Sequence, residues 1–265
     1  MITVFELASG CLHSSSVDEK LALTAHACAL MEKGQIDYTP DGEPLPISAT
    51  GFPSSPKLVD PGKLPRRGLA SESGRIALLH ALAHIEFYAI HLAWDILYRF
   101  RGLPEAFYKD WLGVATEEAL HFSMLRERLR ELGSEYGKLS AHRGLWDVAT
   151  DTSDDLLVRL ALVPRTLEAR GLDVTPGMIE KLLRVGDIRS AEILKRILTD
   201  EIGHVAIGSL WFKTICIQRG LSPETAYFDL VKRCLKGKIH GPINRELRRQ
   251  AGFEESELER LEQLA

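Results

Sequence analysis

The stretches EEALHFSML at residues 117–125 and DEIGHVAIG at residues 200–208 decide the predicted fold. Each contains a Glu-x-x-His motif within a longer segment of helical periodicity, and the first motif pairs Glu118 with His121. Residues three apart on a helix share one face, so the carboxylate and the imidazole of each motif lie side by side. A helical bundle that holds two metal ions uses such a motif twice.

A single glutamate precedes each motif at a similar distance along the chain. Glu86 lies 32 residues before Glu118, and Glu168 lies 33 residues before Glu201. One Glu-x-x-His motif is a weak signal, because it arises readily by chance. The doubled spacing predicts a metal site built by four helices. Its candidate ligands are Glu86, Glu118, His121, Glu168, Glu201 and His204.

The helical phase of these residues supports the prediction. Glu86 interrupts an otherwise apolar stripe, and the two Glu-x-x-His motifs interrupt two further stripes. A lone buried carboxylate is unfavourable by several kcal/mol unless it is paired, protonated or bound to a metal. The alternative for Glu86 is a buried glutamate that is hydrogen-bonded within the protein.

The helix expected around Glu168 is less regular than the others. Pro164 is expected to kink this helix or to change its phase just before Glu168. The alternative is a surface ion pair between Glu168 and Arg165. Spacing along the chain keeps Glu168 among the candidate ligands. The most apolar stripe of this helix consists of Leu156, Leu160, Val163 and Leu167.

Helical periodicity covers most of the chain and no segment alternates like a strand, so we expect an all-α protein. The expected long helices are 72–101, 104–132, 153–171 and 187–219, with shorter helices at 17–33, 177–185 and 222–234 and two charged ones at the C-terminus. A proline-rich strap occupies residues 35–70. We expect residues 1–71 to pack on a bundle formed by residues 72–219, and residues 220–265 to add C-terminal helices to the same domain.

The composition is that of an ordinary globular protein, with 45% hydrophobic residues, 26% charged residues and a formal net charge of −4. None of the four cysteines belongs to a C-x-x-C pair, so we expect reduced thiols in a cytoplasmic protein. The N-terminus lacks the basic region of a signal peptide. No apolar run reaches the ~18 residues of a membrane span, so no membrane partner is expected.

Three histidines of the first long helix, His80, His84 and His91, share a face that points away from Glu86. We expect these histidines to be solvated or packed under the strap rather than to reach the metal site.

Three further residues flank the motifs. Glu117 and Asp200 directly precede the motif glutamates, and each is a candidate to accept a hydrogen bond from a metal-bound imidazole. An exposed acid on the flank of the stripe is the alternative. Gly208 lies on the ligand stripe, where it can open room for a substrate or O2 or allow close helix packing.

The segment 232–249 is basic, with Glu246 as its only acid. Such a face can receive an RNA or a phosphorylated metabolite. The alternative is a solvated face neutralised by the acidic tail EESELERLEQLA at residues 254–265.

Four carboxylates and two histidines form a hard oxygen and nitrogen ligand set. This set suits two divalent ions, iron first and manganese second, better than it suits a closed zinc site. Partly coordinated iron in an apolar pocket can bind and reduce O2.

The six candidate ligands and their spacing resemble those of the ferritin-like di-iron carboxylate superfamily over residues 72–219. The segments LLHALAHIEFYAIHLAWD (78–95), EEALHFSMLRERL (117–129) and ARGLDVTP (169–176) further resemble an uncharacterised bacterial ferritin-like family. That family is distantly similar to the tRNA hydroxylase MiaE. The resemblance implies a ferritin-like four-helix bundle and a di-metal centre.

We therefore expect an O2-dependent di-iron oxidase or hydroxylase that needs an electron donor and acts on a small molecule or an RNA. One rival is a ferroxidase, peroxide scavenger or manganese catalase that acts without an organic substrate. Another is a binding or scaffold protein on the same bundle. A homodimer is one option, and the sequence does not give the oligomeric state.

Overall fold

A computed structural model describes the chain from Met1 to Ala265, apart from residues 41, 45–46, 48–50, 65–67 and 236–238. Helices make up most of the described residues, and the predicted all-α class is confirmed. The described strands are only two residues long: β1 (Ile2–Thr3) pairs in parallel with β2 (Ile36–Asp37). The chain divides into two compact units, Met1–Trp146 and Asp147–Ala265.

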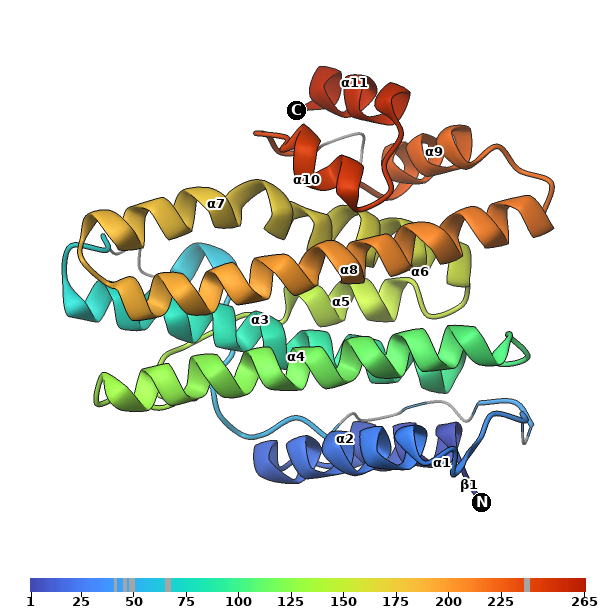
Figure 1. Cartoon of the computed structure of the whole chain (residues 1–265), viewed down its shortest axis with the longest axis horizontal. Coiled ribbons are helices and arrows are strands. Elements are labelled where there is room, and N and C mark those ends of the chain that lie inside the picture. Colours follow the sequence, from blue (N-terminus) through green and yellow to red (C-terminus); the bar gives the residue numbers. More distant parts are fainter. Residues whose placement is uncertain (41, 45–46, 48–50, 65–67, 236–238) are drawn as a thin grey trace. The chain divides into compact units, whose positions relative to one another are not determined.

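Two long helices form the framework of the first unit. α3 (Glu72–Arg99) and α4 (Glu105–Glu131) pack along each other, α1 (Val4–His13) packs on α3, and α2 (Val17–Glu32) packs on α4 (Figure 1). The predicted bounds of α2, α3 and α4 agree with the structure to within two residues. α1 was not anticipated, although Thr3 and Glu6 form the capping box that marks its start.

The composition of α3 reflects its place in the core. By length and hydropathy alone α3 is apolar enough to cross a membrane. However, 67% of its most apolar 18-residue window is buried within the structure. Packing against α1 and α4 therefore accounts for the apolar character of α3.

The described part of the strap, residues 35–70, is largely irregular, as predicted, and contains β2 and one short 3-10 turn (Pro61–Lys63). Its Phe52 ring stacks on the His91 ring, with centroids 4.1 Å apart, and on the Tyr88 ring at 4.8 Å. The backbone N–H of Val59 donates to the carbonyl of Ala141 at 2.8 Å. These contacts hold the strap on α3 and on the segment that follows α4.

A long interrupted helix and α8 form the framework of the second unit. α6 (Leu156–Leu162), a π-helical turn (Val163–Glu168, here the π segment) and α7 (Ala169–Arg184) follow one another without a break. α8 (Ile188–Gln218) packs against all three. Asp187 begins α8 as predicted, because its carboxylate accepts the N–H of Ser190 at 3.1 Å.

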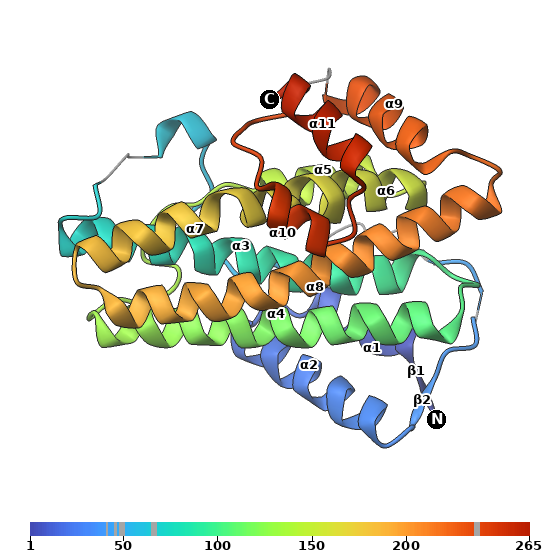
Figure 2. The ribbon, with the colours of Figure 1, turned by 45° about the horizontal axis from the view of Figure 1, so that its top comes forward.

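Three shorter helices complete the second unit: α9 (Pro223–Leu235), α10 (Arg245–Gln250) and α11 (Glu255–Leu264). Figure 2 shows them gathered over one side of α8. The start of α9 at Ser222-Pro223-Glu224 and the two short charged helices are confirmed. α5 (Gly144–Asp151), which spans the boundary between the two units, was not anticipated.

The predicted end of the third long helix at Gly171 is wrong. The helix continues through Gly171 and Pro176 to Arg184, so the separate helix expected at 177–185 is the second half of α7. A proline inside a helix removes one backbone hydrogen bond. Burial of Leu172 and Ile179 in the contact with α8 outweighs that loss.

The predicted bundle of residues 72–219 draws its helices from both units. The division after Trp146 falls inside that range, and α9 to α11 belong to the same unit as α6 to α8. The α3–α4 pair and the pair formed by the interrupted helix and α8 are both present. Their association in a ferritin-like bundle stays a prediction.

Candidate metal centre

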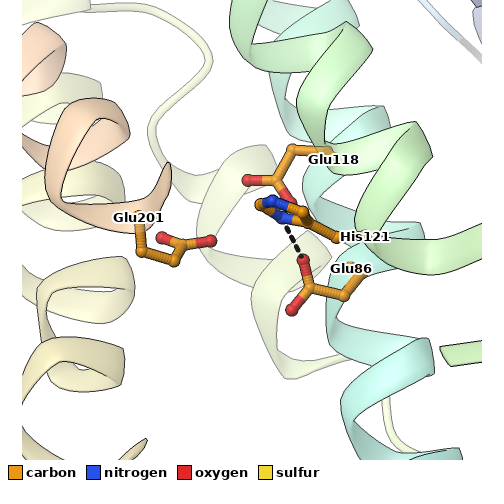
Figure 3. A group of neighbouring side chains, drawn as sticks. All are labelled: Glu86, Glu118, His121 and Glu201. Atoms are coloured by element: carbon orange, nitrogen blue, oxygen red, sulfur yellow. Dashed lines mark hydrogen bonds and ion pairs between the residues drawn. The ribbon is translucent and has the colours of Figure 1, made fainter. Parts of the chain in front are cut away.

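Three predicted ligands come together in the first unit. Glu86 projects from α3, and Glu118 and His121 project from α4, with their side chains directed toward one another (Figure 3). The imidazole Nδ1 of His121 lies 3.3 Å from Glu86 Oε2 and 3.6 Å from Glu118 Oε2. One ligand atom from each residue lies within 4.8 Å of the others, so the three side chains could hold one metal ion.

All three residues of this first ligand set are buried, with residue exposures of 5% for Glu86, 1% for Glu118 and 0% for His121. Burial, together with the nearby charge of Glu118, raises the pKa of Glu86 well above its usual value. Burial alone would lower the pKa of His121, but its contacts with Glu118 and Glu86 outweigh this effect and raise that pKa to about 11. The set therefore concentrates negative charge that a cation or a proton neutralises.

The second unit carries the second Glu-x-x-His motif on α8. His204 Nδ1 lies 3.5 Å from Glu201 Oε1, and the two side chains are 1% and 14% exposed. Glu201 is also drawn in Figure 3. The motif thus repeats in the second unit the pairing of carboxylate and imidazole that α4 provides in the first.

Glu168 is the last residue of the π segment and is half-buried. The predicted change of helical phase at Pro164 is confirmed, because Pro164 is the second residue of the π turn. The alternative of a surface pair between Glu168 and Arg165 is wrong, because Arg165 is buried and its guanidinium donates to Glu257 at 2.8 Å. The role of Glu168 as a ligand stays a prediction.

The flanking residues have local partners. The carboxylate of Asp200 accepts a hydrogen bond from Arg196 at 2.7 Å, one turn earlier on α8. Glu117 is half-buried on α4. Their contacts with metal-bound imidazoles stay predictions.

Gly208 makes a close packing contact. A Cβ atom at this position would lie 2.3 Å from Pro164 Cβ and 2.6 Å from its Cγ. This contact gives the glycine a packing role, and its part in substrate access stays a prediction.

Of the histidines expected to lie away from the ligands, His91 packs under the strap against Phe52, and His80 and His84 bind the segment that follows α4. His84 Nε2 donates to the carbonyl of His142 at 2.9 Å, and its Nδ1 accepts from the Tyr136 hydroxyl at 3.0 Å. His80 Nε2 accepts the N–H of Gly137 at 2.9 Å. Burial lowers the pKa of both His80 and His84 to about 4. Both rings are therefore neutral at pH 7, and their nitrogens form hydrogen bonds within the first unit.

The C-terminal part of the basic segment pairs with carboxylates of the same chain, whereas Lys232 and Arg233 at its start are exposed. Arg245 pairs with Glu255 and Glu262 of the acidic tail, and Arg249 pairs with Glu255. Arg248 is buried. Lys236 and Lys238 lie outside the described residues. The acidic tail thus pairs with two arginines of the segment, and contact of the segment with a nucleic acid stays a prediction.

The ligand atoms define the class of site. Carboxylate oxygens and imidazole nitrogens suit iron or manganese, whereas closed zinc sites are dominated by thiolates. All four cysteines are free and none belongs to the cluster. The molecule is therefore a helical protein with a buried group of glutamate and histidine side chains that could hold a metal ion.

Comparison with known proteins gives the family. The chain belongs to a family described as proteins of unknown function (DUF455), which matches residues 13–259. It is 46% identical over 215 residues to an uncharacterized protein of Haemophilus influenzae, and the match covers 78% of this chain and 75% of that protein. No solved structure matches the chain.

Proposed function

We propose that the protein is a di-metal carboxylate protein, with iron as the favoured metal, that acts as an O2-dependent oxidase or hydroxylase. The observation that carries the proposal is the buried first ligand set, in which Glu86, Glu118 and His121 bring their ligand atoms within 4.8 Å of one another. Two carboxylates buried side by side are unfavourable unless a positive charge compensates them.

The repeated motif supports a second metal ion. Glu201 and His204 reproduce on α8 the pairing of Glu118 and His121 on α4. In the proposed centre, Glu168 joins them in the way that Glu86 joins the first motif. Glu118 and His121 would help to hold one ion, and Glu201 and His204 would help to hold the other.

The chain would contribute binding and exclusion of water. The aromatic rings of Phe87 and Phe122, both fully buried, pack within the α3–α4 pair that carries the first set. Apolar side chains of this kind keep water from a bound oxidant. A bound iron pair would supply the binding and reduction of O2, and an electron donor would be required.

Metal content tests the proposal. Protein purified from iron-rich medium should carry about two iron ions per chain by elemental analysis. Glu118→Gln should lose bound metal, because it replaces a buried carboxylate ligand. The matched control is Glu127→Gln, an exposed carboxylate on the same helix, whose side chain is 63% accessible. A wild-type chain without iron or manganese, or an equal metal content in Glu118→Gln, would refute the proposal.

A second experiment separates the oxygenase from its rival. The protein is loaded anaerobically with Fe(II) and then exposed to O2. A single oxidation of the bound iron, followed by a stable oxidised state, fits an oxygenase whose turnover requires an organic substrate. Continued turnover of Fe(II) or peroxide without an organic compound would assign the chain to the ferroxidase and peroxide-scavenging class instead.

A further inference from the structure

The π segment turns the half-buried Glu168 toward the helix face that carries Leu160, Val163 and Leu172. An α-helix returns to the same face after three or four residues, whereas a π turn contains one residue more. Val163 and Glu168, five residues apart across the turn, therefore share a face. Leu160 and Leu172, on either side along that face, are fully buried. With α-helical spacing, Leu167 would take the place that Glu168 occupies.

Hydrogen bonds from a C-terminal helix stabilise this turn. The hydroxyl of Tyr227, on α9, donates to the backbone carbonyl of Arg165 at 3.1 Å and lies 3.1 Å from Thr166 Oγ1. Thr166 Oγ1 in turn donates to the carbonyl of Ala161 at 2.8 Å, five residues earlier. Tyr227 is completely buried, so its hydroxyl meets these partners in the interior of the unit.

A buried ion pair holds the side chain of Arg165, which projects from the π segment. Arg165 is 0% exposed, and its guanidinium donates to Glu257 of α11, which is 1% exposed. The rings of Phe212, Tyr227 and Phe253 surround the guanidinium, with centroids 4.8, 4.7 and 4.5 Å from its Cζ. The carboxylate and the three rings thus stabilise the buried cation beside the turn.

We propose that Tyr227 and the Arg165–Glu257 pair are positioning residues that keep the π turn in register, so that Glu168 can act as a metal ligand. This inference rests on the proposed function, because it assigns Glu168 to the second metal ion. It places the determinants of that ion's affinity in α9 and α11, helices that carry none of the six candidate ligands.

Co(II) titration, followed by its visible absorption and by equilibrium dialysis, tests the inference. The wild-type chain should bind two equivalents, and Glu168→Ala should weaken one of them. Tyr227→Phe removes one hydroxyl and Arg165→Lys removes the planar guanidinium. Each should weaken the same equivalent by about 10- to 100-fold and change its absorption spectrum, as loss of an outer contact does at other metal sites.

The control is Arg159→Lys, which alters another buried arginine of the second unit. Arg159 donates to Thr152 Oγ1 at 2.7 Å and to the carbonyl of Ala149, two residues that precede α6 in the chain. It should leave both equivalents unchanged. Circular dichroism tests whether each variant is folded. If Arg165→Lys does not fold, Tyr227→Phe alone still tests the inference.

The exchange of Leu167→Glu and Glu168→Leu in one chain tests the register directly. With the π turn in place, the exchange moves the carboxylate one residue back along the helix, away from the face that carries Leu160 and Leu172, and should weaken the second equivalent as Glu168→Ala does. Retained binding would mean an α-helical register and would overturn the inference. Wild-type binding in Tyr227→Phe and Arg165→Lys, with loss in Glu168→Ala, would overturn the positioning role alone. A wild-type chain that binds no metal would overturn the proposed function as well.

Discussion

The two neutral histidines of α3 that bind the segment after α4 should make the first unit sensitive to acid. Burial lowers the pKa of His80 and His84 from a usual value of 6.5 to about 4. The folded chain therefore binds fewer protons than the unfolded chain between these two values. The stability from each histidine is fully present above pH 6.5 and is lost as the pH falls toward 4. At pH 5, the unfolding free energy should therefore be lower by about 2 kcal/mol per histidine than it is well above pH 6.5.

The substitution His80→Gln isolates one of these contributions. The glutamine carbonyl can accept the Gly137 N–H that His80 Nε2 accepts at 2.9 Å, but it does not titrate. The difference in unfolding free energy between wild type and variant should therefore shrink by about 2 kcal/mol between pH 7.5 and pH 5. Guanidinium denaturation with a metal chelator present, followed by tryptophan fluorescence, measures this difference.

The control is His26→Gln, which changes an exposed histidine on α2 of the same unit. This variant should follow the wild-type pH dependence throughout. If the stability curves of His80→Gln and wild type run parallel from pH 7.5 to pH 5, His80 is not held neutral by burial and the reasoning fails.

Three further outcomes are expected. Gly208→Ala should destabilise the chain by about 1–3 kcal/mol in denaturant unfolding, because its Cβ would lie 2.3 Å from Pro164 Cβ. Its control, Gly203→Ala, has open space around it on the same helix and should stabilise the chain by up to about 1 kcal/mol. Equal effects of the two substitutions would contradict the packing argument. Asp173→Asn should lower stability by about 3–5 kcal/mol, since Arg248 would remain as an unpaired buried cation; an unchanged denaturation midpoint would show that the pair is not desolvated. Addition of Mn(II) at about 100 times its dissociation constant should raise the unfolding free energy by about 2.7 kcal/mol per ion, and calorimetry without a shift in the transition would argue against binding to the folded chain.

The long helices were predictable because their signals are local. Asp187 caps α8, Ser71 caps α3 by accepting the N–H of Gly74 at 3.1 Å, and apolar stripes run along both helices. The helical phase also placed Glu86 and the Glu-x-x-His motif of α4 in the interior of the first unit, where they are buried. Periodicity and capping depend on residues a few positions apart, so the sequence alone reports them.

The errors arose where distant contacts override local preferences. Gly171 and Pro176 usually end helices, but packing on α8 carries α7 through both. Arg165 resembled a surface partner for Glu168, whereas its true partner, Glu257, lies 92 residues away in the sequence. Nothing near Arg165 in the sequence indicates that pairing. The change of phase at Pro164 was predictable, but its direction required the structure.

The contacts around Arg165 also determine how the chain can be divided. A chain that ended after α8 would retain all six candidate ligands but would lose Tyr227, Phe253 and Glu257. The guanidinium of Arg165 would then be exposed to water on the side where these residues pack, and the ring of Phe212 beside it would be exposed as well. Loss of one partner from a buried pair alone is unfavourable by about 3–5 kcal/mol. We therefore expect that residues 72–219 do not fold as an independent domain, and that insertions or deletions in the C-terminal helices change the candidate centre.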